Sequence, residues 1–375
     1  MMKVYHIITS LDVGGAETAL KRLVIDTKDD YDIKIFSLTT SGKIAGELIK
    51  EGVDVYSLNI KTLRNVIKSI NLLKNIFIMD KPDVIHSWLY HADLIGGIAS
   101  KLAGVKNVIW GVRTTHLKKG SFSTVVIRQL LSFLSYFIPS KIVCVAEAAR
   151  DFHVKIGYSR KKMIVIGNGF SCDPQKLSEL EVFRERERLG ITVSDIVIGS
   201  VGRFSQDKAQ DLFVQAALLV APNNPDVKFL MVGREIDINN SLLMNPIKKS
   251  GFSSKFILVG EQSDISRWFC LFDIFCLHSR TEGFPNVLGE AMSHGLCCAS
   301  TKAGDAEFIL SNTGVLSEHI TSESIAFSIN QLLILSSAQR IALGRLAKKR
   351  ANDYFSIQKT TSQYNKLYKK MMVGN

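Results

Sequence analysis

The sequence lacks several features that would place it in other classes of protein. No stretch of its 375 residues approaches the ~18 uninterrupted apolar residues that span a bilayer. Residues 1–8 read as a strand and have no export-signal layout. The six cysteines show neither close pairs suited to zinc nor a disulfide framework, and no Asp-x-Asp pair lies in a strand-end loop. We therefore expect an intracellular protein that has no metal site and no membrane-spanning helix.

Positive charge is abundant but unevenly distributed. The net charge is +12, and residues 1–170 hold 24 Lys and Arg against 14 Asp and Glu, whereas residues 171–375 hold 23 against 21. A basic half favours an anionic partner, such as an acidic membrane surface or a lipid phosphate. We do not expect nucleic acid, because no binding motif or basic run with interleaved aromatics accompanies the charge. A solvated basic surface without a partner is the alternative.

Short apolar runs alternate with segments of helical periodicity along the whole chain. The alternation predicts an α/β fold with parallel sheets that helices cover on both faces. We place a domain boundary between residues 172 and 173, ahead of the charged run 183–188, and we expect one amphipathic helix over 351–372. The expected strands are 5–9, 33–38, 53–58, 84–87, 108–112, 142–146 and 164–166, then 196–201, 227–232, 256–259, 274–277 and 297–300.

The stretch 278–295 sets two carboxylates, Glu282 and Glu290, on either side of a loop-to-helix junction. Pro285 suits the first helical position, and first-turn amides at the positive end of a helix accept an anion such as a diphosphate. An ordinary buried helix after a turn is the alternative. One helical face is expected to be apolar and the other to carry Glu290 outward: Val287, Leu288, Ala291 and Met292 against Asn286, Glu290 and Ser293.

Gly202, Arg203 and Lys208 follow the expected strand 196–201 and open a helix. Ligands of α/β sheets bind at the carboxyl ends of strands, where these two cations could neutralise a leaving diphosphate. A surface Arg and Lys beside a strand is the alternative.

The acid, Gly-Phe-Pro and second acid of 282–290, together with Gly-Arg and a Lys after four intervening residues, resemble the signature of retaining GT-B glycosyltransferases. The likeness is to the family 4 type that builds bacterial polysaccharide, O-antigen and capsule. It implies two Rossmann-like, doubly wound domains that face a central cleft. The acceptor domain would be 1–172 and the donor domain 173–350, with a helix in 351–375 crossing back to the first domain.

The resemblance also implies the reaction. A hexose or N-acetylhexosamine would move from a nucleotide-diphosphate sugar, UDP-linked in our expectation, to a glycan or polyprenyl-linked acceptor with retention of configuration. No cofactor or metal is implied, because cations and amides stabilise the leaving group. The enzyme would be cytoplasmic, or peripheral at the inner face of the membrane.

The same resemblance assigns the donor site. Glu282 would orient the hexose, Arg203, Lys208 and the amides after Gly283 would hold the diphosphate, and Glu290 would hold the ribose hydroxyls. The loop 304–307 resembles a further cleft loop, although Asp305 could simply cap a helix. The other expected donor-binding residues are Gly15, Gly202, Gly260, Glu261, Phe284, Pro285, Asn286 and Val287.

The acceptor side is less determined. Many relatives carry a His after the fifth strand, near the anomeric carbon, and here Arg113 or His116 holds that place, with a solvated loop as the alternative. Lys118, Lys119 and Arg128 accompany a strongly apolar helix that could lie in a membrane interface or pack on the sheet. Further acceptor candidates are Gly14 in the first glycine turn, and His86, Trp88 and His91, which could line a pocket or pack beneath it.

Two other functions fit the same residues. One is a nucleotide-sugar epimerase of similar two-domain architecture, which would change the free donor without an acceptor. The other is a non-catalytic, nucleotide-sugar-binding subunit of a glycan assembly complex.

Overall fold

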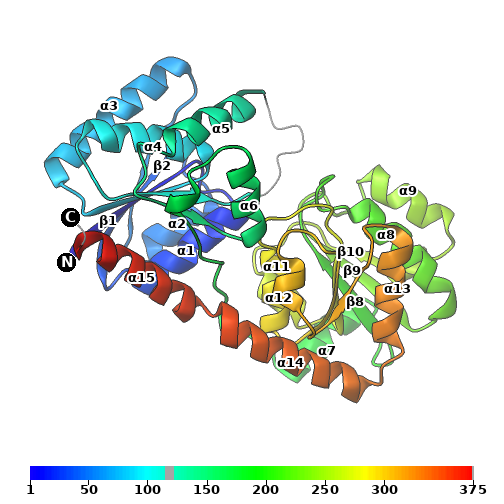
Figure 1. Ribbon diagram of the computed structural model, residues 1–375. Coiled ribbons are helices and arrows are strands. Elements are labelled where there is room, and N and C mark those ends of the chain that lie inside the picture. The colour runs from blue at the N-terminus through cyan, green and yellow to red at the C-terminus, as the bar shows by residue number, and fades with distance from the viewer. Residues whose placement is uncertain (115–121, 374–375) are drawn as a thin grey trace. The chain divides into compact units, whose positions relative to one another are not determined.

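The computed structural model describes residues 1–114 and 122–373, and the chain folds into two compact units (Figure 1). Unit 1 comprises Met1–Gly169 and Ile357–Asn375, and unit 2 comprises Phe170–Ser356. The sequence predicts these boundaries at 172/173 and 350/351. The two points where the chain passes between the units lie together, because the Phe170 amide donates to the Phe355 carbonyl at 2.8 Å.

Unit 1 is built around a seven-stranded parallel sheet with the strand order β3-β2-β1-β4-β5-β6-β7. In chain order its elements are β1 (Met2–Ile8), α1 (Gly15–Thr27), β2 (Tyr31–Ser37), α2 (Lys43–Lys50), β3 (Asp54–Ser57), α3 (Leu63–Asp80), β4 (Val84–Trp88), α4 (Tyr90–Leu102), β5 (Val108–Val112), α5 (Phe122–Leu134), β6 (Lys141–Cys144), α6 (Glu147–Lys155), the 3₁₀ turn η1 (Arg160–Lys162), β7 (Met163–Val165) and α15 (Ile357–Val373).

Helices cover both faces of this sheet, as the alternating pattern predicted (Figure 1). On one face, α3 and α4 bury Leu73, Phe77 and Ile95 against the strands. On the other, α1 and α2 pack with α15, whose Tyr364 and Tyr368 join the same apolar cluster as Leu20. The C-terminal helix therefore belongs to unit 1, which confirms the expected crossing back of the chain.

The single helix expected over 351–372 is wrong. The chain forms α14 (Ser337–Phe355) and α15, and Ser356 between them has an extended backbone with ψ 147°. Phe170 pairs with Ser356 in an isolated bridge, which pulls this residue out of helical geometry. A continuous helical pattern hides the break because neither Gly nor Pro marks it.

Unit 2 is built around a six-stranded parallel sheet with the order β10-β9-β8-β11-β12-β13. In chain order its elements are α7 (Glu179–Arg188), β8 (Ile196–Val201), α8 (Gln210–Val220), η2 (Ala221–Asn223), β9 (Val227–Val232), α9 (Ser241–Lys249), η3 (Ser253–Lys255), β10 (Phe256–Leu258), α10 (Ile265–Phe269), β11 (Ile274–Leu277), α11 (Asn286–Ser293), β12 (Cys297–Ser300), α12 (Ala306–Leu310), β13 (Val315–Leu316), α13 (Ser322–Leu333) and α14.

The core of unit 2 places the site loops at one edge of its sheet. Phe213 of α8, Leu243 of α9 and Ile329 of α13 pack with the buried strands. β11 pairs directly with β8, with Ile274 opposite Ile198. The loops that follow these two neighbouring strands therefore start side by side. The expected strands of both units are confirmed, whereas the two-residue strand β13 was missed.

Candidate functional site

Three glycines lie at the carboxyl ends of β8, β9 and β10. Gly202, Gly233 and Gly260 each follow their strand, and each has a positive φ. The Gly233 amide donates to the Gly260 carbonyl at 2.9 Å. A Cβ on Gly233 would clash with the Gly202 carbonyl, so these backbones approach only because the side chain is absent. The predicted donor residues Gly202 and Gly260 thus come to one edge of the sheet.

Lys208 and Glu282 form an ion pair at the same edge. Lys208 lies between β8 and α8, and Glu282 lies between β11 and α11. Lys208 Nζ is 2.6 Å from Glu282 Oε1, and the two side chains are 27% and 10% exposed. Ser279 Oγ also donates to Glu282 Oε1 at 2.6 Å. The partly buried carboxylate is therefore held by an ammonium and a hydroxyl, which fixes its position.

His278 supports this pair from beneath. Its Nδ1 lies 2.6 Å from the Lys208 carbonyl, and its Nε2 lies 2.6 Å from Ser200 Oγ. Because a carbonyl only accepts, Nδ1 carries the proton and Nε2 accepts from the serine hydroxyl. Burial lowers the pKa of His278 to about 4, so the ring is neutral at neutral pH. A neutral imidazole thus ties β8 to the backbone of Lys208.

A second tie joins the Glu282 loop to the Lys208 loop. The Arg280 amide donates to the Asp207 carbonyl at 2.8 Å, and Arg280 Nη1 donates to Asp211 Oδ1 at 2.8 Å. Arg203 behaves differently. Its side chain is exposed and forms no ion pair within residues 1–114 and 122–373. Of the two predicted cations, Lys208 is already paired and Arg203 extends into solvent.

Helix α11 differs in detail from its prediction. Pro285 occupies the position just before the helix and not its first turn, because its ψ of 89° is not helical. Ser293, expected on the outward face, is buried, and its hydroxyl donates to the Gly289 carbonyl at 2.9 Å. Asn286 and Glu290 are half-buried, on a side less covered than Leu288, Ala291 and Met292. Glu290 therefore lies about one turn into the helix, as expected.

Phe284 is a structural anchor. Its side chain is buried, its ring stacks on Phe170 with centroids 5.9 Å apart, and it meets Phe355 edge-on at the same separation. Pro285 beside it is also buried. The Phe284 ring thus packs in the core and holds the start of α11 in place, and the donor contact expected for Phe284 stays a prediction.

The loop after β12 also reaches the Glu282 segment. The Asp305 amide donates to the Gly283 carbonyl at 3.1 Å. Gly304 has φ +58°, and a Cβ there would clash with the carbonyls of Glu282 and Gly283. The loop 304–307 therefore lies against the predicted site. Glu261, next to Gly260, is exposed at the end of β10.

Sequence reasoning missed Gly233, His278 and Ser279. For Gly233 a signal existed, because Val-Gly-Arg at 201–203 recurs at 232–234 after the next strand. For His278 and Ser279 no spacing shows that they reach Lys208 and Glu282, since the contacts arise only when two distant loops meet.

In unit 1, α1 begins at Gly15, and Gly14 is the extended residue just before the helix. A Cβ on Gly14 would clash with the Glu17 carboxylate, which therefore folds over the first turn. Glu17 is thus the helix-start acid that the dipole favours.

His91 lies in the first turn of α4 and is half-buried. Burial lowers the pKa of its imidazole below the usual value. Leu89, just ahead of the helix, has φ +75°, which is strained for a residue with a side chain and is typical of functional loops. His91 stays a candidate at the carboxyl edge of β4.

His86 and Trp88 are removed from the acceptor candidates. Both are fully buried beneath α15, and their rings stack with centroids 4.6 Å apart. His86 Nδ1 lies 2.9 Å from the Tyr368 hydroxyl, and Trp88 Nε1 donates to His6 Nδ1 at 3.2 Å. The packing alternative therefore holds, because the C-terminal helix covers them.

Arg113 also contacts α15. Its guanidinium lies 4.0 Å from the Trp88 ring centroid, donates to the Tyr364 hydroxyl at 2.6 Å and donates to Asn168 Oδ1 at 2.9 Å. These contacts are those of a residue that fixes the returning helix. The catalytic role expected for it stays a prediction. His116, Lys118 and Lys119 lie outside the described residues.

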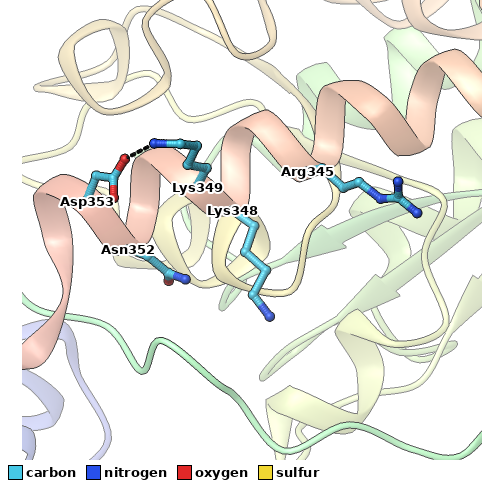
Figure 2. A pocket seen from close by; sticks show the side chains of 5 residues that line it. All are labelled: Arg345, Lys348, Lys349, Asn352 and Asp353. Carbon is cyan, nitrogen blue, oxygen red and sulfur yellow. Dashed lines mark hydrogen bonds and ion pairs between the residues drawn. The ribbon is translucent and has the colours of Figure 1, made fainter.

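Figure 2 shows a cavity of about 340 Å³ on α14. The cavity holds none of the predicted site residues. Lys349 pairs with Asp353 at its rim, at 2.6 Å. It is lined by Arg345, Lys348, Lys349, Asn352 and Asp353.

Two features are absent from the described residues. Within 1–114 and 122–373, no three His, Cys, Asp or Glu side chains gather in a metal-binding arrangement. No helix in that part of the chain combines the length and apolarity needed to cross a bilayer.

Comparisons with known proteins agree with this architecture. Residues 13–173 match the family described as Glycosyltransferase Family 4, and residues 195–334 match Glycosyl transferases group 1. The chain is 27% identical over 243 residues to the UDP-Gal:alpha-D-GlcNAc-diphosphoundecaprenol alpha-1,3-galactosyltransferase of Escherichia coli, a match covering 64% of this chain and 62% of that protein. It is 30% identical over 122 residues to a lipopolysaccharide core mannosyltransferase, LpsB, of Rhizobium meliloti, covering 32% and 35%.

Solved structures share the fold. HepE of Anabaena in complex with UDP-glucose superposes with a TM-score of 0.86 at 20% identity, covering 99% of this chain and all of that one. The apo lipopolysaccharide outer core galactosyltransferase WaaB superposes with a TM-score of 0.71 at 16% identity, covering 97% and 98%. With a family 4 match on unit 1, a group 1 match on unit 2 and two parallel-sheet α/β units, the chain belongs to the family 4 glycosyltransferases of the GT-B fold.

Proposed function

We propose that the protein is a retaining glycosyltransferase. It moves a hexose or N-acetylhexosamine from a UDP-sugar to a glycan or polyprenyl-linked acceptor in surface polysaccharide synthesis. The observation that carries this proposal is the Lys208–Glu282 pair at the strand edge that also holds Gly202 and Gly260. Support comes from the E. coli relative, whose name includes a UDP-sugar and a diphosphoundecaprenol acceptor, and from the UDP-glucose in the HepE structure.

In this proposal Arg203 and Lys208, with the amides after Gly283, bind the donor diphosphate. Lys208 is held only 2.6 Å from Glu282, so the cation for the phosphate and the acid for the hexose are already adjacent. Exposed Arg203 closes on the diphosphate from the solvent side. Glu290 accepts hydrogen bonds from the ribose hydroxyls, Gly260 and Glu261 meet the base, and Gly15 approaches the donor from α1.

The reaction breaks the bond between the anomeric carbon and the diphosphate oxygen, and forms a bond from that carbon to an acceptor oxygen. The acceptor hydroxyl gives its proton to the departing diphosphate on the same face of the sugar, so configuration is retained. Negative charge grows on the diphosphate as the bond breaks. Two cations and oriented amides there stabilise the transition state more than the bound donor. We propose that these groups act without a divalent metal or cofactor.

We also propose that the enzyme works at the inner face of the cytoplasmic membrane, where a polyprenyl-linked acceptor is found. Peripheral contact would use the basic N-terminal half, which carries 24 Lys and Arg against 14 Asp and Glu.

The test follows the fate of the donor. Purified protein is incubated with UDP-sugars, first alone and then with a lipid extract that supplies acceptors, with and without EDTA. A transferase leaves the nucleotide-sugar unchanged alone and releases UDP with the extract, whether or not EDTA is present. Change of the free donor without acceptor would show an epimerase, and binding without turnover on any acceptor would show a non-catalytic subunit.

A further inference from the structure

Helix α5 exposes an apolar stripe along unit 1. Val126, Leu130 and Phe133 recur at steps of four and three residues and so share one face of α5, and Phe137, in the turn after the helix, has its ring centroid 5.3 Å from that of Phe133. They are 45 to 63% exposed, and Tyr136 beside them is 55% exposed. We call these five residues the α5 surface. Soluble proteins seldom leave a contiguous patch of this kind facing water unless something binds it.

The α5 surface ends beside a group of cations. The strand order β5-β6-β7 places the segments ahead of β6 and β7 next to each other, at the amino-terminal edge of the sheet. Lys162 Nζ donates to the Tyr136 carbonyl at 2.7 Å. Burial, and then the neighbouring charge of Lys101, lower the pKa of Lys162, so the two lysines are close. Arg160 and Lys161 of the same turn are exposed. We call these four cations the basic rim.

The charge of the first half concentrates around this edge. Residues 1–100 hold 12 Lys and Arg against 12 Asp and Glu, whereas residues 101–170 hold 12 against 2. No acid occurs from residue 124 to residue 146. The excess of positive charge in the N-terminal half thus lies in the segments that carry the α5 surface and the basic rim.

Arg128 does not contribute to this rim. It was expected to face lipid phosphates, but its guanidinium lies 5.3 Å from the Phe152 ring centroid and packs toward α6. That expectation is corrected. The exposed side chains of this face are mostly apolar, with Gln129 among them, and cations gather at one end.

We propose that the α5 surface and the basic rim dock the protein on an anionic phospholipid bilayer. The proposal rests on the proposed function in one respect, since a polyprenyl-linked acceptor requires an enzyme at the bilayer. Aromatic and aliphatic side chains enter the acyl boundary while lysines and arginines stay among anionic headgroups. A second copy of this chain fits less well, because a symmetric contact would bring two basic rims together without acids between them.

Cosedimentation with large unilamellar vesicles tests the proposal. The full chain is mixed with vesicles of phosphatidylcholine alone and with vesicles of phosphatidylcholine and phosphatidylglycerol. We expect binding to the anionic vesicles that weakens as salt is added, and little binding to the neutral ones. Equal binding to both, or binding to neither, overturns the proposal.

The apolar arm of the test uses Phe133→Ser with Phe137→Ser. We expect its bound fraction to fall several-fold. The matched control is Phe327→Ser with Ile334→Ser, which removes two exposed apolar side chains from unit 2 and should bind as the wild type does. If the Phe133 and Phe137 variant binds vesicles normally and changes only the apparent mass in solution, the surface is a self-association site and the proposal fails.

A second variant, Arg160→Gln with Lys161→Gln, tests the charged part of the surface. It gives an answer even if the apolar variant fails to fold. Each lost cation is expected to weaken binding about fivefold. The matched control is Lys248→Gln with Lys249→Gln, an exposed pair on α9.

Titration with UDP-sugar separates the two proposals. Vesicle binding without donor binding would contradict the transferase alone, and donor binding without vesicle binding would contradict only the docking surface.

Discussion

His278 is the residue on which the position of Lys208 depends. Its neutral ring connects Ser200 at the end of β8 to the Lys208 carbonyl, and both contacts are 2.6 Å. Glu282 then meets Lys208 from the neighbouring loop. Because His278 bonds the backbone of Lys208, it acts by positioning the backbone from which the cation extends.

Two substitutions of His278 separate its two contacts. The carboxamide nitrogen of His278→Asn falls near the place of Nδ1 and keeps the bond to Lys208, whereas that of His278→Gln falls near Nε2 and keeps only the side toward Ser200. We expect His278→Gln to raise the KM for donor on the order of tenfold, because a small misplacement of a binding group is costly. His278→Asn should stay near the wild type. Steady-state kinetics with varied donor measures the difference. A merely structural histidine would lower the Tm in both variants and leave their KM values equal.

Single residues also show what a sequence can and cannot predict. The signature named Arg203, Lys208 and Glu282, and the structure joins the last two. It could not show that His86 and Trp88 are covered, because the hydroxyl that contacts His86 belongs to Tyr368, 282 residues away. The sequence pattern of an aromatic residue at the end of a strand is the same whether a pocket or a helix lies above its ring.

At the scale of elements, the strands were predictable because a parallel sheet buries both faces and so leaves continuous apolar runs. β5, β8, β9, β11 and β12 have the expected bounds. The break at Ser356 was not predictable, since it depends on pairing with Phe170 across the sequence. The two-residue strand β13 is too short to carry a pattern.

The seating of α4 depends on a buried acid. Asp93 in its first turn is fully buried and accepts from Ser87 Oγ of β4 at 2.6 Å and from the Gly111 amide of β5 at 3.3 Å. Burial raises the pKa of Asp93 to about 8 despite these bonds. The carboxyl is therefore protonated in the folded protein at neutral pH, while the unfolded chain is ionised there.

Because the pKa of Asp93 is raised, the free energy of unfolding depends on pH, and the direction of that dependence is fixed. Between the ordinary value near 4 and about 8, the folded state keeps a proton that the unfolded state releases, so stability falls as pH rises. The slope in this window is at most ~1.4 kcal/mol per pH unit. We expect Asp93→Asn, which stays neutral, to remove it.

Urea unfolding of both proteins across this pH window measures the slope, with exposed Asp54→Asn as the control. An unchanged slope in Asp93→Asn would contradict the assignment. The same slope in both carboxamide variants would point to a general charge effect.

At the scale of the whole molecule, the chain forms two units that have separate cores and hold different sets of predicted functional residues. Unit 2 gathers the predicted donor residues at the carboxyl edge of its sheet, and unit 1 holds the basic segment 101–170 and the returning helix α15. The alternation of strands and helices predicted both units. The same alternation could not show which charged residues of unit 1 lie at a reacting centre and which lie on a surface. That depends on which side chains point inward when the unit packs.

The central claim is that unit 2 binds a UDP-sugar through its diphosphate and ribose. Isothermal titration of the wild type, Arg203→Ala and Glu290→Ala with the UDP-sugar that gives the largest thermal shift tests it most directly, with Lys249→Ala as the control. Hydrogen bonds to charged groups contribute about 1.5–3 kcal/mol each, so each site variant should raise the Kd at least ~tenfold while the control leaves it unchanged. Wild-type affinity in both Arg203→Ala and Glu290→Ala would contradict the account.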